Sequence, residues 1–174
     1  VLEDSASNFI PSTKLPAIER AALAACDSRD GVKDGLIGNP AKCSFDPAVL
    51  TCKGADSADC LTTAQVAALK KIYAGPRDGQ GKPLSPGFSF GGENGGTQGW
   101  ARWIASAKPG ESAQYQFAAN FFRNFVFEDA GWDLRSFRLE REMKTIEEKI
   151  APLYEAANPD LSVFQRRGGK LILY

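Results

Sequence analysis

Apolar side chains recur at helical spacing in several separate segments of the chain. In the first, residues 15–25, Ile18 and Ala22 fall on one face of a helix. Pro16 suits the first turn of that helix, because its missing N–H would have no partner there in any case. The pattern predicts a helix that leads the chain to Cys26.

A second helix is predicted after Thr62. Gln65 follows Thr62 at the spacing of a capping box, in which each side chain bonds the backbone N–H of the other residue. Residues 75–99 then hold many Gly and Pro and little periodicity, which indicates a long surface loop that is either flexible or the rim of a binding site. The stripe that defines the helix before this loop consists of Val66, Leu69, Ile72 and Tyr73.

The most aromatic region of the chain begins at Trp100 and Trp103. Beyond them, Phe117, Phe121 and Phe125 recur at helical spacing. One interpretation is a helix packed into a core. The segment is apolar around more than half of its circumference, so the alternative is that some of these rings face a pocket.

The C-terminal part predicts a charged amphipathic helix that Pro152 bends or ends. A short helix is expected from Asn158 to Arg167, ended by two glycines, and the apolar run Lys170–Tyr174 is interpreted as a buried strand. The fold class is therefore mainly α with long irregular loops and one closing β-strand. The stripe of the amphipathic helix consists of Leu139, Met143, Ile146 and Ile150.

Composition excludes two classes of partner. The 174 residues carry 21 basic and 21 acidic side chains, with no charge run typical of a nucleic-acid-binding surface. No apolar run approaches the roughly 18 residues of a membrane span. We expect neither nucleic acid nor membrane as a partner. The chain begins at Val1 without a signal peptide, which we interpret as a cut rather than a natural start.

Four cysteines allow three disulfide pairings. Their grouping along the chain favours Cys26–Cys43 and Cys52–Cys60, each of which closes a short loop. The alternative is a zinc site, but the chain has no Cys-x-x-Cys pair and no histidine. Disulfides predict an oxidising compartment, and hence a secreted or periplasmic protein.

The loop after Cys26 carries carboxylates at Asp27, Asp30 and Asp34, with a glycine beside two of them. Calcium takes six to eight oxygens at about 2.3–2.6 Å, and a short loop of this kind can supply them. The spacing is not that of an EF-hand. The alternative is a polar loop rich in turn formers, because Asp-Gly pairs are common in turns.

Catalysis by this chain alone is not expected. With no histidine, neither a Ser-His-Asp triad nor Cys-His chemistry can be assembled, and no G-x-S-x-G elbow is present. Paired carboxylates can do acid–base work, but those of the acidic loop are better explained by an ion. Composition alone therefore favours a calcium-stabilised, disulfide-bonded binding module.

Several motifs together give the chain a resemblance to the lid domain of the tannase and feruloyl esterase family. They are well spaced and cover nearly the whole chain. These motifs are Ala24–Asp27, Asp30–Gly35, Cys43–Pro47, Leu50–Gly54, Cys60–Thr62, Val66–Pro76, Asn120–Arg123, Val126–Asp129 and Arg167–Tyr174.

The resemblance implies a secreted serine esterase with an α/β-hydrolase core, interrupted by a large lid that holds a structural calcium. Substrates of the family are esters of aromatic acids such as gallate and ferulate, and a bacterial branch acts on a terephthalate monoester. Residues 1–14 would connect from the core, residues 15–157 would form the lid, and residues 158–174 would return to the core. The triad Ser, Asp and His would all lie outside this chain.

Site residues also follow from the resemblance. It implies the same two disulfides, Cys26–Cys43 and Cys52–Cys60. The substrate-facing candidates are Trp100, Trp103, Phe121 and Phe125. The implied calcium ligands are the side chains of Asp27, Asp30 and Asp34 with the backbone carbonyls of Val32 and Leu36.

Two hypotheses from different classes remain at this point. The first is a lid-domain segment of an aromatic-ester hydrolase, whose partners are the substrate and the missing core. The second is a self-contained calcium-binding module without esterase activity. The flanking sequence distinguishes them, because a serine motif before Val1 and a triad Asp soon after Tyr174 would establish the first.

Overall fold

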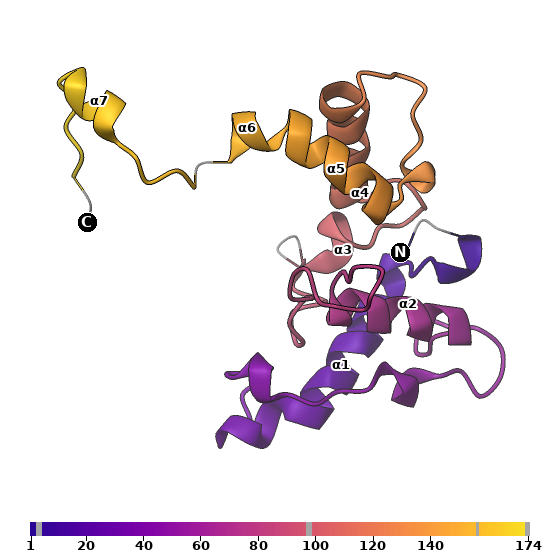
Figure 1. Ribbon diagram of the computed structural model, residues 1–174. Helices are drawn as coiled ribbons and strands as arrows, with labels where there is room; N and C mark the ends of the chain where they lie inside the picture. Colours follow the sequence, from indigo (N-terminus) through magenta and orange to yellow (C-terminus); the bar gives the residue numbers. More distant parts are fainter. Residues whose placement is uncertain (3–4, 97–98, 156, 173–174) are drawn as a thin grey trace.

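The computed structural model describes residues 1–2, 5–96, 99–155 and 157–172, and its described part is mainly helical (Figure 1). Two longer helices, α1 and α2, lie at one end, α3 to α6 follow, and α7 sits on an extended arm (Figure 1). None of the helices in the described part is both long and apolar enough to cross a membrane. The α-helices are α1 (Leu15–Cys26), α2 (Thr63–Ala74), α3 (Trp100–Trp103), α4 (Ala113–Phe121), α5 (Leu139–Lys149), α6 (Ala151–Tyr154) and α7 (Ser162–Arg166).

Short irregular helices connect these elements. In the described part of the chain, the 3-10 helices are η1 (Ala6–Asn8), η2 (Ser12–Lys14), η3 (Asp27–Asp30), η4 (Pro40–Lys42), η5 (Pro47–Leu50) and η8 (Leu134–Ser136). The element η7 (Phe122–Val126) is a π-helical turn that continues α4. Among the described residues, β-pairing is limited to isolated bridges, such as the one between Thr51 and Leu61.

Helices α1 and α2 form where the sequence predicts them. The capping box of α2 is complete: the Thr62 hydroxyl accepts from the Gln65 N–H, and the Gln65 side chain accepts from the Thr62 N–H. The two helices share one hydrophobic cluster, in which Ile18 and Leu69 are fully buried. This cluster also takes up Trp100 from α3.

The first fourteen residues pack more closely than a polar connector would. Ile10 is 2% exposed and Leu2 is 8% exposed, and both belong to the cluster between α1 and α2. Lys14, at the end of this segment, is also buried. The composition of this segment is mixed, but Leu2 and Ile10 bury their side chains in the cluster, and Lys14 donates to Gln65 of α2.

The predicted strand Lys170–Tyr174 does not form in the described residues. Residues 170–172 are irregular, and residues 173–174 lie outside the described part. Ile172 is 82% exposed and Leu171 is 58% exposed. A strand needs a neighbouring strand for its backbone hydrogen bonds, and the described residues offer none beside this segment. The prediction is wrong for residues 170–172.

The aromatic helix also differs from the packed-core interpretation. Phe117 is 68% exposed and Phe125 is 53% exposed, so neither is a core residue. Helical periodicity marks the side of a helix on which apolar residues gather, but it does not state what covers that side. In this chain α4 and the η7 turn that continues it leave Phe117 and Phe125 at the surface, whereas Phe121 is half-buried.

Candidate functional site

The acidic loop folds around its own backbone. Asp27 is 7% exposed, and its carboxylate accepts from the N–H groups of Asp34 and Gly35, with 3.2 Å from each nitrogen to Oδ1. Asp30 accepts from Val32 at 3.1 Å and from Gly38 at 2.8 Å. These bonds to N–H groups hold the pKa of the Asp30 carboxyl below its usual value.

Glycines make this loop possible. Gly31 and Gly35 have φ of +98° and +81°, a region that residues with a Cβ rarely adopt. Gly38 lies close to the same carboxylate, and a Cβ there would lie 2.5 Å from Asp30 Oδ2, so a larger residue would displace that side chain. The sequence pattern did not single out Gly38, since its role depends on a carboxylate eight residues away.

The donor chemistry of the loop fits a hard cation, but its carboxylates do not converge. Each of the three implied acidic ligands accepts from a backbone N–H, including Asp34 from Leu36 at 3.1 Å. In the described part of the chain, no arrangement of their ligand oxygens brings all three carboxylates within 4.8 Å of one another. Val32 and Leu36, the two implied carbonyl ligands, have exposed side chains.

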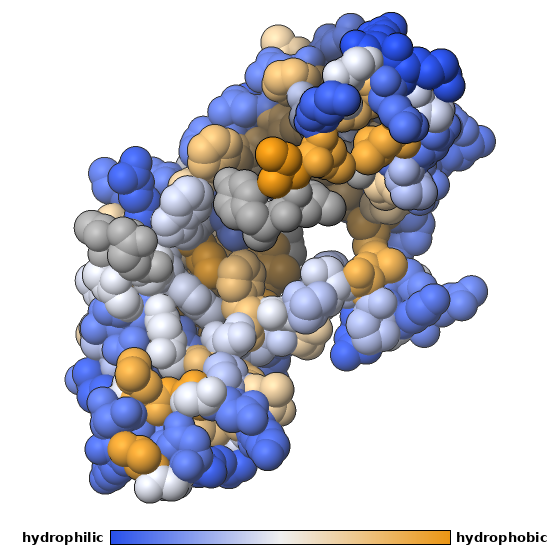
Figure 2. Space-filling view, turned by 90° about the vertical axis from the view of Figure 1, so that its left-hand side faces the viewer, coloured by the Kyte–Doolittle hydropathy of each residue, from blue (hydrophilic) through white to orange (hydrophobic). Residues whose placement is uncertain are grey.

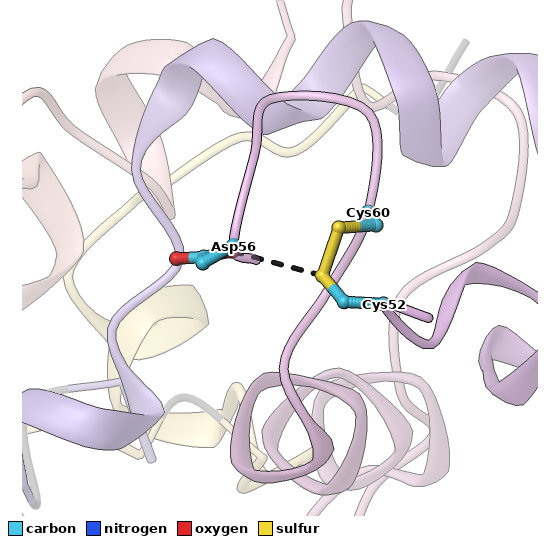
Figure 3. Close-up of side chains that lie close together, drawn as sticks. All are labelled: Cys52, Asp56 and Cys60. Carbon is cyan, nitrogen blue, oxygen red and sulfur yellow. Dashed lines mark hydrogen bonds between the residues drawn. A yellow bond between two sulfur atoms is a disulfide. The ribbon is translucent and has the colours of Figure 1, made fainter. Parts of the chain in front are cut away.

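Both predicted disulfides are confirmed. Cys26–Cys43 spans 17 residues and ties the acidic loop to the end of α1, and Cys52–Cys60 spans 8 residues. Asp56 lies inside the second loop, with its Oδ1 3.8 Å from Cys52 Sγ (Figure 3). These three residues have the types of a metal site. Their sulfurs are bonded to each other, however, and a disulfide sulfur is not the thiolate that metals bind.

A group of rings, most of them exposed, is contributed by α3, α4, η7 and α6, and we call it the aromatic face. It consists of two stacked pairs and one ring from α6. Trp103 stacks on Phe117 with ring centroids 6.3 Å apart, and Phe121 stacks on Phe125 at 5.9 Å. Tyr154 meets Phe121 edge-on at 6.2 Å. On the side from which the C-terminal arm extends, apolar patches interrupt the polar surface (Figure 2).

The four substrate-facing candidates therefore separate. Trp103, Phe121 and Phe125 belong to the aromatic face, whereas Trp100 is 8% exposed and packs in the core. Trp100 contacts Tyr73 and Phe88, and its burial leaves no free ring face for a substrate. Tyr154 was missed because it lies on another helix, and no local spacing links it to Phe121.

The whole chain, residues 1–174, matches the family model described as tannase and feruloyl esterase. This chain belongs to that family. The resemblance drawn from the motifs is thus confirmed.

Named relatives support the same assignment. The chain is 40% identical over 177 residues to an uncharacterized esterase of Xanthomonas campestris pv. campestris, covering 95% of this chain and 30% of that protein. It is 30% identical over 196 residues to the mono(2-hydroxyethyl) terephthalate hydrolase of Piscinibacter sakaiensis, covering 92% and 32%. The chain spans about a third of the length of these relatives.

Solved structures of the family share the fold. Feruloyl esterase B from Aspergillus oryzae superposes with a TM-score of 0.70 at 28% identity, covering 95% of this chain and 32% of that one. The tannin acyl hydrolase from Aspergillus niger superposes with a TM-score of 0.59 at 20% identity, which shows the fold alone.

Proposed function

We propose that this chain is the lid-domain segment of a secreted serine carboxylic ester hydrolase that acts on aromatic esters. The family match over all 174 residues, in a chain without a single histidine, carries this proposal. Residues 15–157 form the lid. Residues 1–14 and 158–174 connect it to an α/β-hydrolase core that holds the triad. The two disulfides support a secreted location.

The aromatic face is proposed to shape the acyl pocket of the whole enzyme. Trp103, Phe121 and Phe125 present ring surface that is not used in the described core. A planar acyl group stacked on such a ring gains roughly 0.5–1.5 kcal/mol beyond the burial of its area. That gain favours aromatic acyl groups over small aliphatic ones.

Alanine substitutions in the longer protein test this proposal. Phe125→Ala and Trp103→Ala should lower kcat/KM for methyl ferulate or methyl gallate about three- to tenfold, by the stacking energy just given. Activity on a nitrophenyl acetate should change far less. Trp100→Ala is the matched control, because loss of a core aromatic costs roughly 3–5 kcal/mol of stability and should lower the melting temperature instead. Equal losses on both substrates for Phe125→Ala would contradict the proposal.

The acidic loop is proposed to hold a structural calcium through Asp27, Asp30 and Asp34 and the carbonyls of Val32 and Leu36. The hard oxygen donors and the disulfide that closes the loop support it. The carboxylates of Asp27 and Asp34 accept hydrogen bonds from backbone N–H groups of the loop. A bound ion would take the place of these donors, and its positive charge would hold the loop together. Differential melting with calcium and with a chelator tests this, with about 2.7 kcal/mol gained at a hundredfold excess over Kd. Identical melting temperatures would exclude the site.

The isolated chain is expected to leave esters uncleaved. Acyl transfer needs an activated nucleophile, a base and oxyanion donors. The chain has no histidine, and both disulfides consume its cysteines. The assay is purified chain against methyl ferulate, methyl gallate and a nitrophenyl acetate. Turnover that survives repurification and disappears with one point mutation in the chain would overturn this expectation.

A further inference from the structure

A pocket of about 860 Å³ opens where the end of α2, the loop 75–88, α4 and the segment around η8 meet. We call it the basic pocket. Its apolar lining includes Ile72, Phe88, Ile104, Tyr115 and Phe137. A volume in this range is that of a typical small-molecule site, and aromatic and aliphatic lining is what such sites use.

The charges of the basic pocket are all of one sign. Among the described residues that line it there are five cations and neither Asp nor Glu. Two of the cations pair with a carboxylate outside the lining: Lys70 with Asp46 at 2.8 Å and Arg135 with Asp133 at 3.9 Å. The other three, Lys71, Arg77 and Arg138, have no carboxylate within 4.0 Å in the described part of the chain.

Two of these three cations are held in place by backbone acceptors. Arg77 Nη1 donates to the Gly81 carbonyl at 2.8 Å, and Arg138 Nη1 donates to the Phe137 carbonyl at 2.7 Å. A guanidinium carries five N–H donors, so each retains donors for a ligand. A carboxylate is the group that this fork matches in a bidentate manner.

The wall of the basic pocket is preformed. The loop 75–88 folds back onto the end of α2, with Phe88 N donating to the Ile72 carbonyl at 3.3 Å. Gly87 allows this contact, because a Cβ there would lie 2.0 Å from the Tyr73 carbonyl oxygen. Gly75 is equally confined, with φ of +72° and a Cβ position 2.5 Å from Ser85 O.

We propose that the basic pocket binds an aromatic monocarboxylate, with the ring against its apolar lining and the carboxylate near Lys71, Arg77 and Arg138. This site is lined by none of the rings of the aromatic face. A carboxylic acid is ionised at neutral pH, whereas its ester is uncharged. The basic pocket therefore selects the acid over the ester. As far as the proposed function holds, that acid is the class of product that the enzyme releases.

Calorimetric titration of the protein with ferulate, methyl ferulate and acetate tests the site. Ferulate should bind, the methyl ester should bind at least tenfold more weakly, and acetate should show no binding because it lacks a ring. Raising the salt from 50 to 500 mM should weaken ferulate binding, since the cations are at the surface. Equal affinity for the acid and the ester would overturn the proposal.

Single substitutions locate the site. Lys71→Gln, Arg77→Gln and Arg138→Gln should each lower the affinity for ferulate about threefold or more, given the strength of exposed charge pairs. Lys53→Gln is the matched control, an exposed lysine outside the pocket, and should leave the affinity unchanged. If Trp103→Ala removes binding and the three pocket variants retain it, the acid occupies the aromatic face and the inference is wrong. Because binding is measured without turnover, a lack of esterase activity would not affect this test.

Discussion

Replacing Lys14 by Met tests how far a single buried ammonium stabilises the fold of this chain. Lys14 is 4% exposed, and its Nζ donates to the Asp56 carboxylate, to Cys60 O at 2.8 Å and to Gln65 Oε1 at 3.0 Å. One cation thus links the start of α1, the loop of the second disulfide and the capping box of α2. Met keeps the packing of the stem but removes the three donors.

The magnitude follows from what each acceptor loses. Breaking a fully buried charge pair costs about 3–5 kcal/mol, but Asp56 is 52% exposed and water can replace the lysine there. Gln65 Oε1 also keeps the Thr62 N–H at 3.0 Å. The main loss is then the bond to the Cys60 carbonyl, and bonds to charged groups are worth about 1.5–3 kcal/mol. We expect about 1–3 kcal/mol, or a melting temperature lower by about 2–12 °C.

A neighbouring ion pair provides the control. Arg20 Nη2 lies 2.8 Å from Asp59 Oδ1, so it joins the same helix to the same disulfide loop, but the two side chains are 63% and 82% exposed. Arg20→Met should cost less than about 1 kcal/mol, as exposed pairs usually do. Thermal and urea unfolding of both variants, followed by circular dichroism, give the comparison. If Lys14→Met costs no more than Arg20→Met, the reasoning from burial is refuted.

Two further predictions concern other carboxylates. Glu93 is fully buried and accepts from the Tyr73 hydroxyl at 2.5 Å and from the Gly91 N–H at 3.1 Å. Glu93→Ala should therefore lower the free energy of unfolding in urea by roughly 1–3 kcal/mol. Glu111→Ala, at an exposed position, is the control and should lower it by less than about 0.5 kcal/mol. The pKa of Asp46 is lowered chiefly by its bond to Lys70, and the pKa of Glu128 by its bond to Lys149. A carboxyl group whose pKa is lowered in the folded state stabilises the fold at pH values above its unfolded-state pKa. This stabilisation is lost as the pH falls through the folded-state pKa. Melting temperatures should therefore hold down to about pH 4 and drop below it, and a constant melting temperature down to pH 2 would contradict this.

The acidic loop illustrates how chemistry can be predicted without geometry. Residue types alone predict Asp27, Asp30 and Asp34 as hard-cation donors, because carboxylate oxygens are hard donors in any fold. Their orientation was not predictable. The backbone angles at Gly31 and Gly35 decide whether the oxygens point at one centre or at N–H groups. Glycine permits many backbone angles, so the sequence does not specify which are adopted.

The sequence by itself determined the helices α1 and α2, the capping box of Thr62 and Gln65, and the family. These rest on interactions between residues only a few positions apart, which periodicity and spacing record. The sequence also favoured the correct disulfides, since short loops close most readily.

Only the tertiary structure decided which rings are buried. Trp100 and Trp103 lie three residues apart, yet the first packs against Tyr73 and the second is 46% exposed. The basic pocket was likewise absent from the sequence pattern, because Lys71, Arg77 and Arg138 belong to three segments that carry no common motif. Exposure and the lining of a pocket depend on contacts between distant segments. The predicted strand is absent at residues 170–172 for the same reason, because a pattern can specify the face of an element but not the partner that covers it.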